Sequence, residues 1–180
     1  TPSAWPSLAG GVLEAARFRS DPLAGGPVSW VRVSAALPAS LQPSAFLTTA
    51  FSGGEGCWYD QGTVYFTTKG NNRVWAYTVA SSRLEVIYDD DLYPDSPLTG
   101  VDNVVVSQSG DLYVAEDGGD MQLCIITPER VVAPFLQVVG HGGSELTGPA
   151  FSPGGDRLYF SSQRGSGGQG ITYEVMGPFS

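Results

Sequence analysis

One pattern occurs three times along this chain: a glycine turn, then a short strand-forming run that ends in tyrosine and an aromatic or β-branched residue. The three copies occupy residues 62–66, 110–114 and 155–160. The tyrosines of successive copies, Tyr65, Tyr113 and Tyr159, are 48 and then 46 residues apart. A repeat of roughly 40–50 residues built from short strands is typical of β-propeller blades. The repeat therefore predicts an all-β chain of the propeller type.

The length of the chain limits how much of a propeller it can hold. A blade takes roughly 40–45 residues, so the 180 residues hold about four blades. Propellers of four blades are at the small end of the range, and the sequence begins at Thr1-Pro2 without an initiator Met or an apolar signal region. We therefore expect a partial propeller. Its predicted parts are an irregular blade with an insertion at 12–52, blades at 53–92 and 100–140, and a terminal blade at 145–177.

Turn-forming Gly, Asn and Ser residues divide these parts into short runs, as tight hairpins require. The predicted strands are 12–18 and 27–34; 56–60, 63–69, 73–79 and 83–90; 101–108, 111–116, 121–128 and 131–139; and 147–152, 157–163 and 171–176. Residues 45–51 are interpreted as a short helix or an insertion. The run 104–106 is Val-Val-Val, which predicts an innermost strand buried on both faces.

The composition excludes two classes of partner. The net charge is −9, from 18 acidic and 9 basic residues, and such a field repels nucleic acid and anionic membranes. No apolar run approaches the roughly 18–20 residues needed to cross a bilayer. Charged residues make up only 15% of the chain beside 24 Gly and 13 Pro, which favours a turn-rich all-β fold. The excess of acidic residues serves solubility or binds cations.

The two cysteines, Cys57 and Cys124, fit no CxxC metal-binding pattern. A disulfide between adjacent blades would suit an oxidising compartment. The alternative is two buried free thiols, which we favour. Cys57 is two residues from Glu55, so it could line a site without acting in it.

Strand direction predicts where the polar residues meet. In an antiparallel meander, the start of the first strand and the end of the second lie on the same face of the disc. The starts carry Glu55, Asp102, Asn103 and Glu145, and the ends carry Lys69-Gly70-Asn71, Glu116-Asp117 and Gln163-Arg164. We expect all of them on one rim near the central channel. Carboxylates gathered there would repel one another unless cations were bound, and oxygen-only ligands select hard ions, calcium first.

Several of these residues also have a plain structural interpretation. Asp102-Asn103 and Asp117-Gly118-Gly119 are frequent turn formers. The acidic run 89–91 is interpreted as solvated charge at the end of an outer strand. His141, the only histidine, lies in a glycine-rich loop and cannot complete a triad in a chain without an obvious nucleophile. The glycine-rich stretch 165–170 lacks the lysine of a phosphate-binding loop.

Five ordered motifs resemble the PhoX-type alkaline phosphatase family of secreted bacterial propellers. They are Phe-Ser-Gly-Gly-Glu-Gly at 51–56, Val-Asp-Asn at 101–103, Tyr-Val-Ala-Glu-Asp-Gly at 113–118, Glu-Leu-Thr-Gly-Pro at 145–149 with Phe-Ser-Pro at 151–153, and Leu-Tyr-Phe-Ser-Ser-Gln-Arg-Gly at 158–165. The ending at 172–179 also looks like the family's C-terminus. The likeness covers most of the chain.

The resemblance implies a six-bladed ring, of which this chain is the C-terminal portion, in a secreted or periplasmic enzyme. It implies a central site with calcium and iron that hydrolyses phosphate monoesters. By motif, Glu55, Glu116 and Glu145 look like metal-site glutamates with a catalytic role, and Asp102, Asn103 and Asp117 look like neighbouring or calcium ligands. The family's motif of cysteine with paired glutamates is absent from this sequence, so iron ligation by that cysteine cannot be assigned here.

Three functional hypotheses follow. The first is part of a metal-dependent phosphatase, in which Arg164 or Lys69 offsets the phosphate charge and the N-terminal half of the propeller is the partner. The second is a calcium-dependent lactonase or ester hydrolase, whose propellers also hold a central calcium. The third is a binding propeller that keeps only a structural calcium. Iron content separates the first from the second, and bound metal without turnover of either ester class supports the third.

Overall fold

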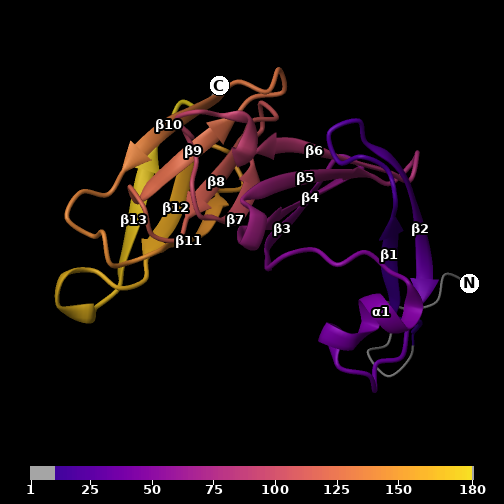
Figure 1. Ribbon diagram of the computed structural model, residues 1–180. Coiled ribbons are helices and arrows are strands. Elements are labelled where there is room, and N and C mark those ends of the chain that lie inside the picture. Colours follow the sequence, from indigo (N-terminus) through magenta and orange to yellow (C-terminus); the bar gives the residue numbers. More distant parts are fainter. Residues whose placement is uncertain (1–10, 180) are drawn as a thin grey trace, which may run out of the picture.

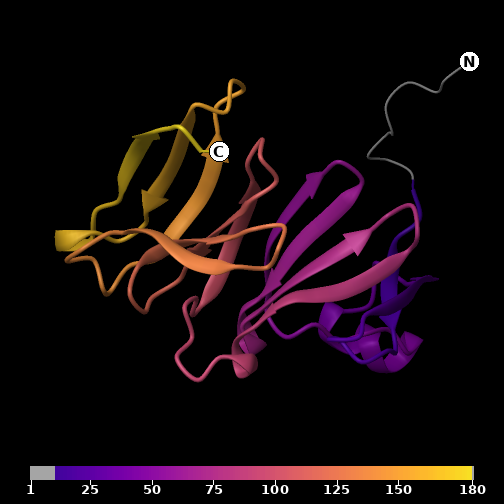
Figure 2. The same ribbon diagram turned by 90° about the horizontal axis from the view of Figure 1, so that it is seen from above.

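The computed structural model describes residues 11–179 as three antiparallel sheets that fan out side by side (Figure 1). Figure 2, seen from above, shows the sheets following one another in chain order around their inner strands. All pairings between strands are antiparallel, as the sequence predicted. Within the described residues no helix has the length and apolarity needed to span a bilayer.

The first sheet has six strands in the order β1-β2-β6-β5-β4-β3. Its strands are β1 (Glu14–Phe18), β2 (Gly26–Arg32), β3 (Gly54–Asp60), β4 (Thr63–Thr68), β5 (Arg73–Thr78) and β6 (Arg83–Asp89). The β1–β2 hairpin joins β6 through only two residue pairs, Gly26 with Leu84 and Pro27 with Arg83. The strands predicted at 12–18 and 27–34 thus form a hairpin attached to the sheet of the next blade.

The segment between β2 and β3 contains one short helix, α1 (Gln42–Phe46). Proline suits the first turn of a helix, because a backbone N–H at that position would have no intrahelical acceptor and its absence costs nothing. The helix ends at Leu47, which has a left-handed backbone at φ 53°. The helix expected at 45–51 therefore begins three residues earlier and its last helical residue is Phe46, so only two residues of the predicted run are helical.

The second sheet has the order β10-β9-β8-β7 and the third the order β11-β12-β13. Their strands are β7 (Val101–Val106), β8 (Leu112–Glu116), β9 (Gln122–Ile126), β10 (Val132–Gln137), β11 (Leu146–Phe151), β12 (Arg157–Ser162) and β13 (Ile171–Met176). Every strand predicted for these two parts is present: the one at 171–176 has the predicted bounds, β11 begins and ends one residue earlier than predicted, and the others are shorter. The repeated Tyr113 and Tyr159 lie within β8 and β12, the second strands of their sheets.

The core consists of side chains packed between neighbouring sheets. Val104 and Val106 pack in a cluster with Val74 and Tyr88 of the first sheet, whereas Val105 packs in another cluster, which includes Leu158 of the third sheet. The three valines are 4%, 0% and 8% exposed. The prediction of a central strand buried on both faces is confirmed, because alternate side chains of β7 enter the two inter-sheet cores.

Candidate metal centre

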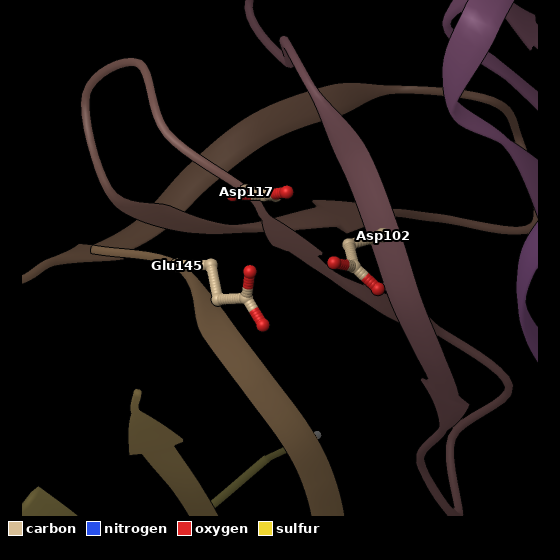
Figure 3. Close-up of side chains that lie close together, drawn as sticks. All are labelled: Asp102, Asp117 and Glu145. Atoms are coloured by element: carbon tan, nitrogen blue, oxygen red, sulfur yellow. The ribbon is translucent and has the colours of Figure 1, made fainter. Parts of the chain in front are cut away.

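Three carboxylates meet where the inner strands of the second and third sheets begin and end. Asp102 lies on β7, Asp117 directly follows β8, and Glu145 directly precedes β11. An isolated bridge pairs Asp117 with Glu145. Figure 3 shows the three side chains around one point. One oxygen from each carboxylate lies within 4.8 Å of the others.

Glu55, at the start of β3, extends the acidic group towards the first sheet. Its side chain is exposed, and its charge helps to raise the pKa of Asp102. The largest cause of that rise is burial of Asp102, which is 7% exposed, and the charges of Glu55 and Glu145 add to it. Lys69 acts in the opposite direction. Asp102 is therefore a carboxylate whose ionised form lacks enough compensating positive charge in the protein alone.

Two cationic side chains flank the carboxylates. Lys69 Nζ forms an ion pair with Asp117 Oδ2. Arg164 Nη2 lies 3.1 Å from Glu145 Oε2 and 3.9 Å from Asp117 Oδ1. Both cations follow the second strand of a sheet, as the argument from strand direction predicted. Arg164 thus bridges two of the three carboxylates, and Lys69 pairs with one of them.

Asn103 fixes the spacing between β7 and β11. Its amide Nδ2 donates to Asp102 Oδ1 at 2.6 Å. Its amide oxygen accepts hydrogen bonds from Thr147 Oγ1 at 2.9 Å and from the backbone N–H of Gly148 at 2.6 Å. Asn103 therefore holds the strand of Asp102 against the strand that follows Glu145, and its oxygen is already engaged in doing so.

Two predicted site glutamates lie outside the group of three carboxylates: Glu55, which is exposed, and Glu116, whose carboxylate is bonded elsewhere. Glu116 is 2% exposed, and its Oε1 accepts hydrogen bonds from the backbone N–H of Thr99 at 2.8 Å and from Thr99 Oγ1 at 3.2 Å. Its Oε2 accepts from the backbone N–H of Gln122 at 2.9 Å. Burial raises the pKa of Glu116, and these hydrogen bonds oppose the rise. Glu116 ties the loop before β7 and the start of β9 to the end of β8, and it is not one of the three grouped carboxylates.

Close contact between β3 and β7 depends on two residues that sequence analysis did not single out. Thr67 Oγ1 donates to the backbone carbonyl of Asp102 at 2.5 Å and accepts from the backbone N–H of Gly56 at 2.8 Å. A Cβ added to Gly56 would lie 2.5 Å from the Asp102 carbonyl oxygen, closer than real contacts allow. The sequence predicts a site role for Glu55, and the structure shows that the adjacent Gly56 sets how near the two strands come.

His141 contacts the first of two linked serine hydroxyls next to the centre. Its Nδ1 lies 2.8 Å from Ser162 Oγ, which lies 2.9 Å from Ser144 Oγ. Ser144 Oγ also accepts from the backbone N–H of Arg164 at 2.7 Å. Ser144 and Ser162 are buried. This chain of hydroxyls joins the loop before Glu145 to the residue that carries the flanking guanidinium.

Both cysteines are free thiols, and they differ in how far they are buried. Cys124 is buried, and desolvation raises its pKa to about 12. Cys57 is exposed. The expectation of two buried thiols is therefore wrong for Cys57, because its face of β3 lacks a covering element among the described residues.

The donor set of the centre fits a hard divalent cation. The three oxygens lie within 4.8 Å of one another, close enough for one calcium ion, with ligands at about 2.4 Å, to contact all of them. Burial raises the pKa of Asp102, and the charges of Glu55 and Glu145 add to the rise, so a bound cation would favour its ionised form. The group holds oxygen donors from Asp and Glu and, among the described residues, no cysteine or histidine.

A scan of protein-family models and a search of curated proteins found no match to this chain. Solved structures do match. A luciferin-regenerating enzyme has a TM-score of 0.58 at 19% identity over 73% of this chain and 47% of its own. A streptogramin B lyase has a TM-score of 0.48 at 19% identity, over 72% and 42% of the two chains. A protein of unknown function from Bacteroides thetaiotaomicron has a TM-score of 0.49 at 13% identity, over 63% and 28%.

The first of these likenesses concerns the fold alone, because its identity is low. The chain spans about half the length of the luciferin-regenerating enzyme that it matches. Together with the antiparallel sheets that follow one another in chain order, the likeness confirms the prediction of an all-β, partial β-propeller. The chain is a portion of a β-propeller, with an acidic centre at the inner ends of its sheets.

Proposed function

We propose that this chain forms part of a metal-dependent phosphatase that hydrolyses phosphate monoesters, as its resemblance to the PhoX-type family implies. The observation that carries the proposal is the pairing of three clustered carboxylates with two flanking cations, Lys69 and Arg164. A cation site needs the carboxylates alone. Positive side chains at its rim would suit an anionic substrate, because guanidinium and ammonium groups bind phosphate oxygens.

Each side chain then has a distinct task. Asp102, Asp117 and Glu145 would hold a calcium ion, with Glu55 beside them. A bound metal ion supplies Lewis-acid polarisation of the phosphoryl group and makes water a better nucleophile. Arg164 would turn from Glu145 and Asp117 towards the substrate, since its side chain is 48% exposed. Lys69 neutralises Asp117 until a phosphate competes for its ammonium group.

Iron and a secreted or periplasmic location belong to the same proposal and depend on the family resemblance. Iron would require ligands beyond the oxygen donors gathered here, such as the family's cysteine motif, which this sequence does not contain. The remaining blades of a six-bladed ring would have to supply them.

Metal content and turnover of the complete protein that carries residues 1–180 test this proposal. Glu145→Gln removes one ligand charge at nearly constant shape, so bound calcium and phosphate release from a simple monoester should fall together, each on the order of tenfold or more. Glu174→Gln is the matched control. Glu174 lies on β13 and accepts a hydrogen bond from Arg157 of β12, outside the group of three carboxylates. Wild-type turnover and metal content in Glu145→Gln would overturn the assignment.

The donor set also favours a second candidate, a calcium-dependent lactonase or ester hydrolase. Oxygen donors without cysteine or histidine suit calcium and do not require iron. The same samples decide between the two. Turnover of a lactone or carboxylic ester with calcium alone supports the second candidate, and turnover of a phosphate monoester with calcium and iron supports the first.

A further inference from the structure

One face of the first sheet is apolar and only half covered. Thr67 points towards β7, so the alternate residues of β4, Val64 and Phe66, point to the opposite face. Cys57 pairs with Phe66, and Tyr59 pairs with Val64, which places all four side chains on that face. We call these four residues the open face. Cys57 is exposed, and Tyr59 is 65% exposed.

The outer part of the same side of the sheet is covered by the β1–β2 hairpin. Phe18 and Val28 of the hairpin pack with Trp75, Leu84 and Val86 of β5 and β6. The hairpin stops short of β3. Between the hairpin and the open face lies a cavity of about 310 Å³, whose lining includes Ala16, Val28, Phe51, Cys57, Val64 and Phe66.

The corresponding inner strands of the second sheet are not left open. On β7 and β8, the residues equivalent to the open face, which include Val104 and Val114, pack in one cluster with Val74 and Tyr88 of the first sheet. The cover comes from the preceding sheet, whose inner strands β3 and β4 contact β7, and Figure 2 shows these two sheets side by side. The open face has the same position in its own sheet and lacks that kind of neighbour among the described residues.

We propose that the open face binds the two inner strands of a further antiparallel sheet. Two observations point to this occupant. The β1–β2 hairpin already covers β5 and β6 on the same side of the sheet, and the match to the luciferin-regenerating enzyme that shares the fold covers only 47% of that enzyme. The inference rests on the propeller fold and is independent of the proposed function.

The occupant would dock mainly through its side chains. Adding a strand along the whole free edge of β1 is hindered, because Thr49 already bonds there. Its backbone N–H donates to the carbonyl of Ala16 at 2.8 Å, and its hydroxyl accepts from the N–H of Phe18 at 2.7 Å. The partner is therefore an antiparallel pair of strands with alternating apolar residues that fill the cavity beside Phe66.

Thiol reactivity reports directly on this face. Cys57 lies on it, and the buried Cys124, with its pKa raised to about 12, is an internal control. In residues 1–180 alone, Cys57 should react with a disulfide reagent at pH 8, whereas Cys124 should react only after unfolding. When the polypeptide encoded immediately upstream of Thr1 in the same reading frame is joined to the chain, Cys57 should react at least about tenfold more slowly.

A variant on the open face makes the test independent of the thiol. Val64→Asp should weaken association with the separately expressed upstream polypeptide by about tenfold or more. Val139→Asp, at a side chain that is 82% exposed, should leave it unchanged. If Val64→Asp does not fold by circular dichroism, the Cys57 rates decide. Unchanged Cys57 rates, an upstream frame that encodes no strands, or protection that depends on the concentration of residues 1–180 alone would overturn the proposal, the last by showing that a second copy covers the face.

Discussion

Asp102 and Glu116 show how two buried carboxylates of one sheet can have opposite uses. Both have a raised pKa, and in both burial is the main cause. Glu116 is held by hydrogen-bond donors on both oxygens, whereas Asp102 faces other carboxylates. Glu116 therefore belongs to the frame, and Asp102 belongs to the centre that the frame supports.

Replacing Asp102 by Asn should stabilise the metal-free chain at neutral pH. Because the folded-state pKa of Asp102 is raised, its stabilising contribution is present below its ordinary pKa and is lost as the pH rises through the folded-state value. The Asn side chain keeps an oxygen for the Asn103 amide. Urea unfolding with chelator should show the variant gaining over wild type as the pH rises from 4 to 8. A constant difference across that range would contradict the sign.

Glu116→Gln should destabilise the chain by about 1–3 kcal/mol. In the wild type, Glu116 Oε2 accepts from the backbone N–H of Gln122, and an amide NH2 in its place would leave that N–H without an acceptor. Urea unfolding measures the loss. Glu174→Gln, at an exposed position, should stay within about 0.5 kcal/mol of wild type. Equal effects of the two substitutions would show that the hydrogen bonds of Glu116 contribute little.

Among the elements, the contact between β3 and β7 is the one that tolerates least change. It consists of a glycine against a backbone carbonyl, with Thr67 bonded to both strands. Strand β7 cannot withdraw, since its valines fill the cores on both sides. A side chain added at this contact must therefore move backbone.

Gly56→Ala should cost about 1–3 kcal/mol or more and should weaken calcium binding, because the new Cβ would push the Asp102 backbone away. Gly54→Ala provides the control within the same strand, as a Cβ there meets nothing within 4 Å. Thermal unfolding with and without calcium compares them. The idea fails if both alanine variants unfold at the wild-type temperature.

At the scale of the whole molecule, the centre lies where the second and third sheets of a partial propeller meet. It draws side chains from successive sheets, and the chain spans about half of a comparable propeller. Residues 1–180 alone should therefore release little or no phosphate from a simple monoester and bind calcium weakly, because affinity depends on ligand number and rigidity. Phosphate release at the rate of the complete protein would refute this.

The repeat and the turn residues predicted nearly all strands, because a period-2 pattern bounded by Gly and Asn leaves few alternatives. Strand direction placed Asp102, Asp117 and Glu145 at one rim. It could not separate Glu116 from Asp117, since adjacent residues at a strand end face opposite ways and only tertiary contacts decide which carboxylate meets the others. The position of β1–β2 on the next sheet likewise depends on packing around Trp75 that no local pattern encodes.

The bridge between Asp117 and Glu145 gives the centre a mechanical role. There the second and third sheets are joined by a backbone bridge, whereas elsewhere they contact each other through packed side chains. An ion held by Asp102, Asp117 and Glu145 would link the two sheets at that point. Removing the ion with a chelator should therefore let the two sheets move relative to each other before either sheet unfolds. Hydrogen exchange should then quicken first at residues 144–148, while the interior of β8 stays protected.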